Sequence, residues 1–163
     1  MLIVKWIVIV IVVLVAGGIA AGQFGFLKGT PPTDLGVREG RLKALSNTDN
    51  SVSSQAGLYP DHPQRAYSSI APLSLNGDGP ATIAKIKTIV QATAGAAVVK
   101  SEPDYLYAQY TTPLMKYVDD VEFWFDPTNS VVQVRSASRI GKGDLGANRK
   151  RVEALRAALA ASR

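Results

Sequence analysis

The residues best suited to binding chemistry are basic and gather in the last third of the chain. Residues 131–151 contain six basic residues and one acidic residue, within a chain of formal net charge +5. Guanidinium groups bind carboxylates and phosphates through charge-assisted hydrogen bonds, and free N–H groups at a helix start bind the same anions. With a glycine-rich turn to bring them together near residues 145–147, we expect these side chains to bind an anion or an acidic partner. The expected site residues are Arg135, Arg139, Asn148, Arg149 and Arg151.

Acidic residues close in the sequence offer these arginines a purely structural role. The expected ion-pair partners are Asp119, Asp120, Glu122 and Glu153. Ion-pair networks that only hold elements together resemble binding sites in a sequence. Both interpretations of the arginines therefore stay open.

The side chains that could support catalysis do not form a set. Neighbouring strand residues point to opposite faces, so Asp119 and Asp120 cannot line one pocket without a β-bulge. His62 lies in a proline-flanked loop, and Ser53 and Ser54 have no nearby basic partner. The chain has no cysteine and one histidine, which excludes thiolate metal sites, Cys nucleophiles and His pairs. We expect no enzyme, no catalytic residue, no metal and no cofactor.

The N-terminal segment is typical of a membrane anchor. Between residues 2 and 22 the only charged residue is Lys5. A helix of that length extends about 31 Å, which matches a hydrocarbon core of about 30 Å. We expect residues 1–27 to be a transmembrane anchor; the alternative is a signal peptide cleaved near Gly22. Basic residues lie on both sides, so the positive-inside rule gives no clear orientation. The very short N-terminal flank favours a single-pass protein of the bacterial inner membrane with a periplasmic C-terminal domain.

The rest of the chain divides into a linker or arm, residues 28–45, and one domain, residues 46–163. The polar stretch 46–54 is predicted to be turn-forming. Asp78 and Asp144 are placed as N-caps of two helices, which end near residues 94 and 161. Strands rich in Val, Tyr and Phe are expected over residues 66–75, 96–101, 105–111, 117–125 and 131–138.

This order of elements predicts an α+β fold, with a transmembrane helix followed by a two-layer domain. The domain is expected to have an antiparallel sheet of four or five strands and two main helices. In the last hairpin, alternation places Phe123 toward the core. If Phe123 lies opposite Val134, then Glu122 lies opposite Arg135 on the other face, a favourable cross-strand charge pair. A bulged turn with Asn129 in the left-handed conformation would shift this register and remove the pairing.

Several runs of residues resemble a known family. They are residues 117–123 (YVDDVEF), 134–141 (VRSASRIG) and 144–153 (DLGANRKRVE), with 50–54 (NSVSS) similar to the family's Asn-Cys-Val-Ser-Ser segment. Over residues 45–159 the chain resembles domain-of-unknown-function family 1499, whose members occur in bacteria and plastids. The resemblance implies a compact domain in a membrane-associated setting and no activity that can be transferred. Ser51 stands where many members have cysteine, so any disulfide or thiol role there is absent from this chain.

Two functions fit these features. The first is a membrane-anchored accessory or interaction protein, whose domain docks on a larger membrane protein complex or on anionic lipid through the basic surface. The alternative is a small-anion binding protein or hydrolase with a pocket near Arg135, Arg139 and Asn148. Nucleic acid is not an expected partner, because the anchor and the interleaved acidic residues both disfavour it.

Overall fold

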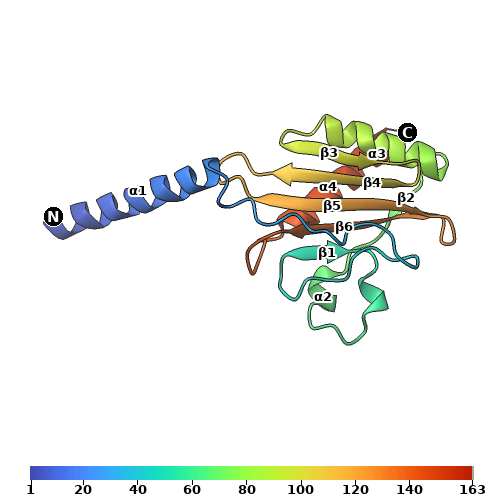
Figure 1. The fold of residues 1–163 in the computed structure, drawn as a ribbon, viewed down its shortest axis with the longest axis horizontal. Helices are drawn as coiled ribbons and strands as arrows, with labels where there is room; N and C mark the ends of the chain where they lie inside the picture. The colour runs from blue at the N-terminus through green and yellow to red at the C-terminus, as the bar shows by residue number, and fades with distance from the viewer. Residues whose placement is uncertain (163) are drawn as a thin grey trace.

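One antiparallel sheet organises the domain, and two helices cover one of its faces (Figure 1). The computed structural model describes residues 1–162. The helices are α1 (Leu2–Gln23), α2 (Arg65–Ser68), α3 (Gly79–Gln91) and α4 (Ala147–Ala161), with a 3-10 turn at Ala56–Leu58. The strands are β1 (Ser51–Ser53), β2 (Leu73–Ser74), β3 (Ala96–Ser101), β4 (Tyr105–Thr111), β5 (Val118–Asp126) and β6 (Val131–Ser138).

The strand order is β1-β6-β5-β4-β3, and β2 pairs with the other end of β6. Phe123 lies opposite Val134 and Glu122 opposite Arg135, so of the two registers that the sequence left open the last hairpin has the first. The α+β class is confirmed too, with six strands rather than four or five. Strand β3 forms the free edge of the sheet, and its pairing with β4 shifts register between Val98 and Lys100.

The core lies between the sheet and helices α3 and α4. Helix α3 buries an apolar stripe of Ile83, Ile86 and Val90, as its spacing predicts. Helix α4 adds Val152, Leu155 and Leu159. These stripes pack on the inward-facing residues of the central strands, among them Phe123 and Val134. Full burial of each such side chain stabilises the domain by about 1.5–3 kcal/mol.

Two segments near the start of the domain differ from the sequence prediction. Residues 66–75 do not form one strand, because the segment begins as α2 and only Leu73–Ser74 pairs with the sheet. The polar segment 46–54, predicted as a turn, contributes β1. Both short strands pair with β6, at its opposite ends. Their conformation therefore follows from long-range pairing rather than from local sequence pattern.

The outer face of the sheet is covered by residues 28–45, which we call the arm. In Figure 1 the arm follows α1 in blue and crosses the sheet in front, on the side away from α4. The Gly36 N–H donates to Glu122 Oε1 at 2.7 Å, and Arg135 Nε donates to the Ala44 carbonyl at 3.2 Å. The arm thus turns the second face of the hairpin into a buried surface.

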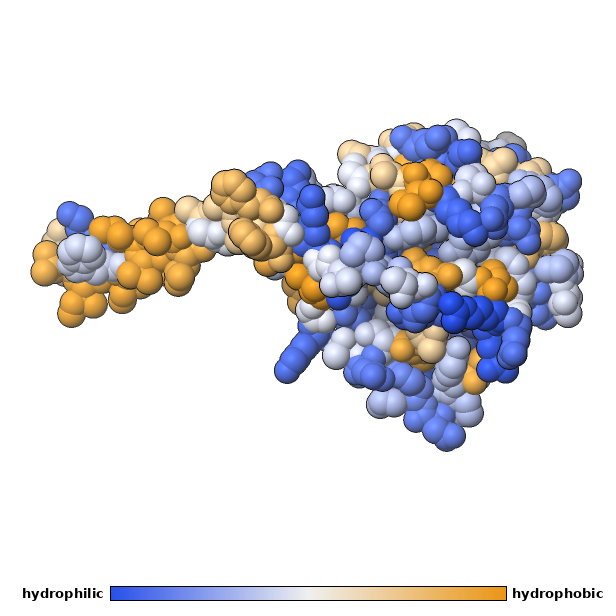
Figure 2. All heavy atoms as spheres, viewed as in Figure 1, coloured by the Kyte–Doolittle hydropathy of each residue, from blue (hydrophilic) through white to orange (hydrophobic). Residues whose placement is uncertain are grey.

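Helix α1 projects from one end of the domain and is long and apolar enough to span a membrane. Figure 2 shows it as an almost continuous hydrophobic surface. Its C-terminal end contacts the loop between β4 and β5. The Gln23 side chain donates to the Leu114 carbonyl at 3.0 Å, and the backbone of Met115 lies so close to Gly22 that no side chain would fit there.

The start of α3 provides a test of local helix stabilisation. Asp78 accepts a hydrogen bond from the Ala81 N–H at 2.7 Å, as predicted for an N-cap. We expect Asp78→Ala to lower the free energy of unfolding by about 1 kcal/mol, because that N–H loses its acceptor. Denaturant unfolding of the full chain in detergent measures the change. Asp61→Ala, at an exposed loop position, is the matched control, and equal losses in both variants would contradict the capping role.

Candidate functional site

A cavity of about 590 Å³ lies between the arm and strands β5 and β6. Arg135 lines it and is only 4% exposed. Apart from the bond from Nε to Ala44, its guanidinium makes no hydrogen bond or ion pair with the residues that the structure describes. Burial lowers the pKa of Arg135, against the charge of the nearby Glu122. The guanidinium keeps its charge because arginine does not deprotonate in proteins.

A second arginine of the cavity is fully engaged. Arg139 donates two hydrogen bonds of 2.8 Å to the Asp120 carboxylate, in the paired geometry that guanidinium and carboxylate favour. Tyr107 donates its hydroxyl hydrogen to the same carboxylate. This bonding to Asp120 raises the pKa of Arg139. The pair leaves little free charge for a ligand.

The arm supplies a cation and an anion to the same cavity. Lys43 Nζ lies 2.6 Å from Asp34 Oδ1, and their side chains are 32% and 49% exposed. A partly exposed pair of this kind contributes little to stability and exchanges partners easily. Hydrogen bonding to Lys43 lowers the pKa of Asp34. Neither residue was singled out in the sequence, because proline and glycine marked the arm as a linker.

Glu122 is the most deeply buried acid of the outer face. Its Oε1 accepts hydrogen bonds from the Tyr105 hydroxyl at 2.8 Å and from Gly36, while Oε2 has no partner among residues 1–162. Burial raises the pKa of Glu122, against these hydrogen bonds and the charge of Arg135. Although Glu122 and Arg135 lie opposite each other, they form no ion pair within 4 Å.

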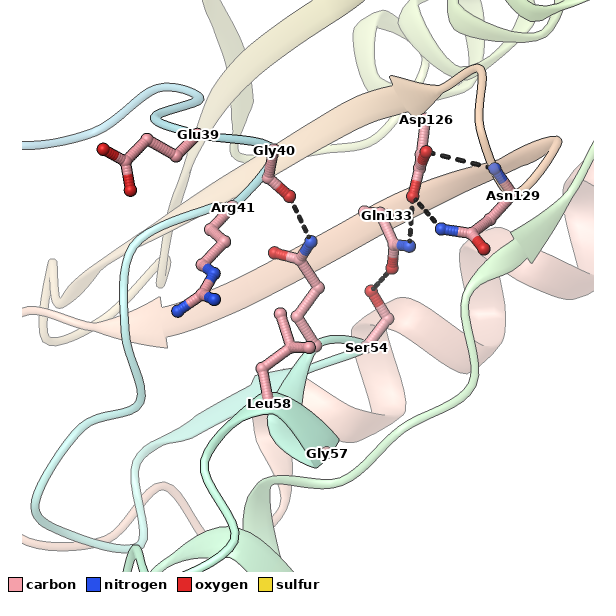
Figure 3. Close-up of a pocket in the computed structure, with 10 residues that line it drawn as sticks. Glu39, Gly40, Arg41, Ser54, Gly57, Leu58, Asp126, Asn129 and Gln133 are labelled. Atoms are coloured by element: carbon pink, nitrogen blue, oxygen red, sulfur yellow. Dashed lines mark hydrogen bonds between the residues drawn. The ribbon is translucent and has the colours of Figure 1, made fainter.

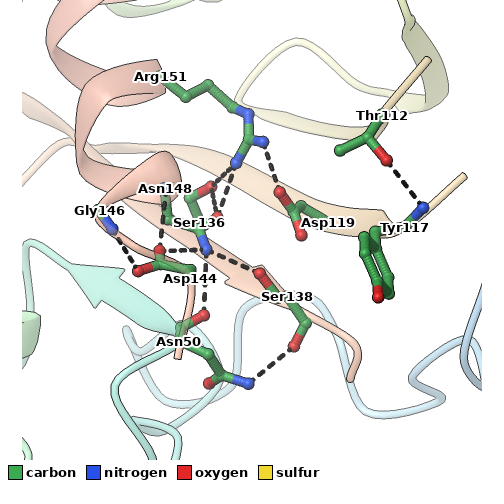
Figure 4. A network of polar contacts seen from close by, with 10 residues as sticks. All are labelled: Asn50, Thr112, Tyr117, Asp119, Ser136, Ser138, Asp144, Gly146, Asn148 and Arg151. Carbon is green, nitrogen blue, oxygen red and sulfur yellow. Dashed lines mark hydrogen bonds and ion pairs between the residues drawn. The ribbon is translucent and has the colours of Figure 1, made fainter. Parts of the chain in front are cut away.

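A separate polar network lies on the inner face, beneath the start of α4 (Figure 4). The amide of Asn148 is fully buried and uses both ends. Its oxygen accepts from Ser136 at 2.6 Å and from Arg151 at 2.7 Å, and its nitrogen donates to Asp144 at 2.7 Å. Arg151 also pairs with Asp119. The network joins α4 to the sheet with nearly every polar group already used.

Two further contacts hold the start of α4 in place. Arg149 donates to the Ser69 carbonyl at 2.9 Å and to the Tyr67 carbonyl. Tyr67 also donates its hydroxyl hydrogen to Asp144. Burial, together with the adjacent Asp144 carboxylate, raises the pKa of Tyr67 to about 12. Although burial opposes the effect, hydrogen bonds from Tyr67, Asn148 and Gly146 lower the pKa of Asp144.

The expected convergence of the arginines is therefore wrong. Arg135 and Arg139 lie on the outer face with the arm, whereas Asn148, Arg149 and Arg151 lie on the inner face with α4. Alternation along β6 separates the two groups, because Ser136 points inward between arginines that point outward. Of the expected ion-pair acids, Asp119 pairs with Arg151, Asp120 with Arg139 and Glu153 with Arg156, while Glu122 pairs with none.

A smaller cavity of about 330 Å³ lies under residues 39–41 of the arm, beside the turn between β5 and β6 (Figure 3). Ser54 donates to Gln133 at 2.7 Å, and Gln133 and Asn129 each donate to Asp126. These side chains are hydrogen-bonded to one another, so they offer a ligand few free donors or acceptors. Within residues 1–162, no group of three or more His, Asp or Glu side chains could hold a metal ion.

Glu122 makes stability depend on pH. Glutamate has a usual pKa of about 4.3. Folding raises the pKa of Glu122 above this usual value. The stability that the protonated side chain contributes is therefore fully present below the usual pKa and is lost as the pH rises through the folded-state pKa. We expect Glu122→Gln to gain stability relative to the unmodified chain between pH 4 and pH 8, as measured by thermal unfolding. Glu153→Gln, on exposed α4 surface, is the control, and a pH-independent difference for Glu122→Gln would contradict the burial of a charge.

Comparison with known proteins gives one match. No curated protein and no solved structure matches the chain significantly. The family described as Protein of unknown function (DUF1499) matches residues 41–159. This range includes the polar residues of both faces of the sheet and leaves out the first part of the arm. The match covers well over half of the 163 residues, so the chain belongs to the DUF1499 family.

Proposed function

We propose that the chain is a membrane-anchored accessory protein without enzymatic activity, whose domain lies on the periplasmic surface of the bacterial inner membrane. One observation carries this proposal: the last turn of α1 contacts the loop between β4 and β5, while the rest of the helix projects away from the domain. Met115 fills the space beside Gly22 and Gly18, one helical turn apart on α1, where a larger residue at Gly22 would not fit. A helix held in this way fixes which end of the domain faces the bilayer.

Apolar side chains gather at that end of the domain. Phe24 and Phe26 are 81% and 79% exposed, and Leu114 and Leu145 are 57% and 97% exposed. A cavity of about 360 Å³ between the β4–β5 and β6–α4 loops, lined by Tyr117 and Leu145 among others, opens in the same region. Aromatic and leucine side chains that water would disfavour are favoured at a membrane interface.

Leu145 is the least expected of these residues. It has φ +51°, a left-handed conformation that is strained for leucine, and nearly its whole side chain is exposed. The lysines Lys28 and Lys142 are also exposed near the helix exit. Lysines beside inserted apolar residues suit contact with lipid phosphates. Lipid headgroups are therefore the partner that we propose.

The arginines supply less support for docking on a membrane protein complex. Arg139 and Arg151 are engaged with Asp120 and Asp119, and Arg149 binds backbone carbonyls. A basic docking surface made from them would first have to break these bonds. We therefore propose contact with lipid as the basis of the accessory role.

Depth in the bilayer tests this orientation directly. The chain has no cysteine, so single cysteines can carry a fluorophore at chosen positions. In nanodiscs we expect labels at Leu145→Cys and Leu114→Cys to be quenched by nitroxide-bearing lipids. A label at Asn129→Cys, on the turn at the opposite end of β5, should be quenched several-fold less. Equal quenching at all three positions would overturn the proposed seating.

The side of the membrane needs a separate measurement. In bacterial spheroplasts, an impermeant maleimide should label Asn129→Cys before lysis if the domain is periplasmic. Labelling that appears only after lysis would place the domain in the cytoplasm. Recovery of a soluble chain that lacks residues 1–22 would instead show that the N-terminal helix is a cleaved signal.

A further inference from the structure

The cavity under the arm contains a positive charge that the chain leaves incomplete. Arg135 is only 4% exposed, and its two terminal nitrogens have no acceptor among residues 1–162. A buried charge without a partner is unfavourable, so such groups are normally paired or bound to a ligand. Glu122 lies opposite Arg135 across the hairpin, but its Oε1 accepts hydrogen bonds from Tyr105 and Gly36 instead.

The other charges of the cavity leave room for an added anion. Arg139 is neutralised by Asp120 in a pair whose side chains are 5% and 3% exposed. Lys43 is held only by the half-exposed Asp34 at the edge of the cavity. An entering anion can replace Asp34 as the partner of Lys43 while it reaches Arg135. Two cations of the cavity are thus available to one ligand.

The remaining walls of the cavity define what else the ligand carries. Hydroxyl groups come from Thr30, Thr33 and Ser46, and apolar surface comes from Pro31, Pro32 and Leu45. A cavity of about 590 Å³ lies within the usual range for small-molecule sites. Mixed walls of this kind suit a charged group joined to a small apolar body.

We propose that this cavity binds an anion with one phosphate or carboxylate group and an apolar body, with the charged group between Arg135 and Lys43. Paired guanidinium hydrogen bonds recognise both kinds of anion. The apolar body lies along the prolines of the arm and Leu45. The same chemistry is offered by a free metabolite and by the headgroup of an anionic lipid. Binding of a free metabolite does not depend on how the domain is oriented on the membrane, whereas binding of a headgroup rests on the proposed membrane seating.

The binding test uses the full chain in phosphatidylcholine nanodiscs, titrated with inorganic phosphate and with octanoate by calorimetry. We expect saturable binding, tighter for octanoate because it alone carries an apolar body. A second set of nanodiscs contains phosphatidylglycerol. If octanoate binding weakens there by more than octanoate partitioning into protein-free discs of the same composition, the lipid headgroup occupies the cavity; if the two change equally, the ligand is a free anion.

Three variants that each remove one charge should change octanoate affinity in different directions, which a purely structural role of these residues would not produce. Lys43→Gln should weaken octanoate binding about tenfold, since one charge-assisted bond is lost. Asp34→Asn should tighten it several-fold, because the competing carboxylate is gone. Lys100→Gln is the matched control: Lys100 is also paired with an acid, Glu102, but lies on β3 at the far edge of the sheet.

Two results would overturn the proposal. One is the absence of saturable binding of phosphate and octanoate in phosphatidylcholine, with no effect of phosphatidylglycerol on the unfolding temperature. The other is an equal change of affinity in Lys43→Gln, Asp34→Asn and Lys100→Gln, which would reveal only a non-specific effect of net charge. Arg135→Gln should abolish binding; if it fails to fold, the three surface variants still decide the question.

Discussion

Burial of charge on both faces of the β5–β6 hairpin is the constraint on which the rest of the structure depends. Asp119, Asp120 and Glu122 are successive acids of one strand, and all are at most 4% exposed. Carboxylates removed from water need hydrogen-bond donors close by. Helix α4 brings Arg151 to the inner acid, and the arm brings the Gly36 N–H to the outer face. The hairpin therefore requires cover from two sides, and the arm is part of the fold rather than a spacer.

The residues that carry the family resemblance are largely the residues of these two clusters. Asp120, Glu122, Arg135 and Arg139 form the outer one, and Asn148 and Arg151 are central to the inner one. Most of them hold elements together, since their polar atoms are already bonded within the chain. Arg135 differs, because it lines a cavity and its terminal nitrogens have no acceptor among residues 1–162. Structural residues and the residue with the proposed binding role thus occur side by side in one hairpin.

Local pattern predicts the parts of this fold that local interactions stabilise. The Asp78 cap, the stripe of α3 and the strands of the β5–β6 hairpin follow from spacing and turn residues. Strands β1 and β2 do not, because each forms only by pairing with β6 across a long stretch of chain. The same limit applies to the candidate site. Alternation alone separates Arg135 from Ser136, but only the tertiary structure shows that the arm covers Arg135 and supplies Lys43.

The free edge of the sheet has a consequence for the membrane anchoring that we propose. Strand β3 leaves one row of backbone groups unpaired, and identical chains in one plane would meet such edges often. The register shift between Val98 and Lys100 interrupts that row, and Lys100 places a positive charge on it. Irregularity and lysine on an edge both oppose edge-to-edge strand pairing. Neighbouring copies can therefore crowd together in two dimensions without aggregating through their sheets.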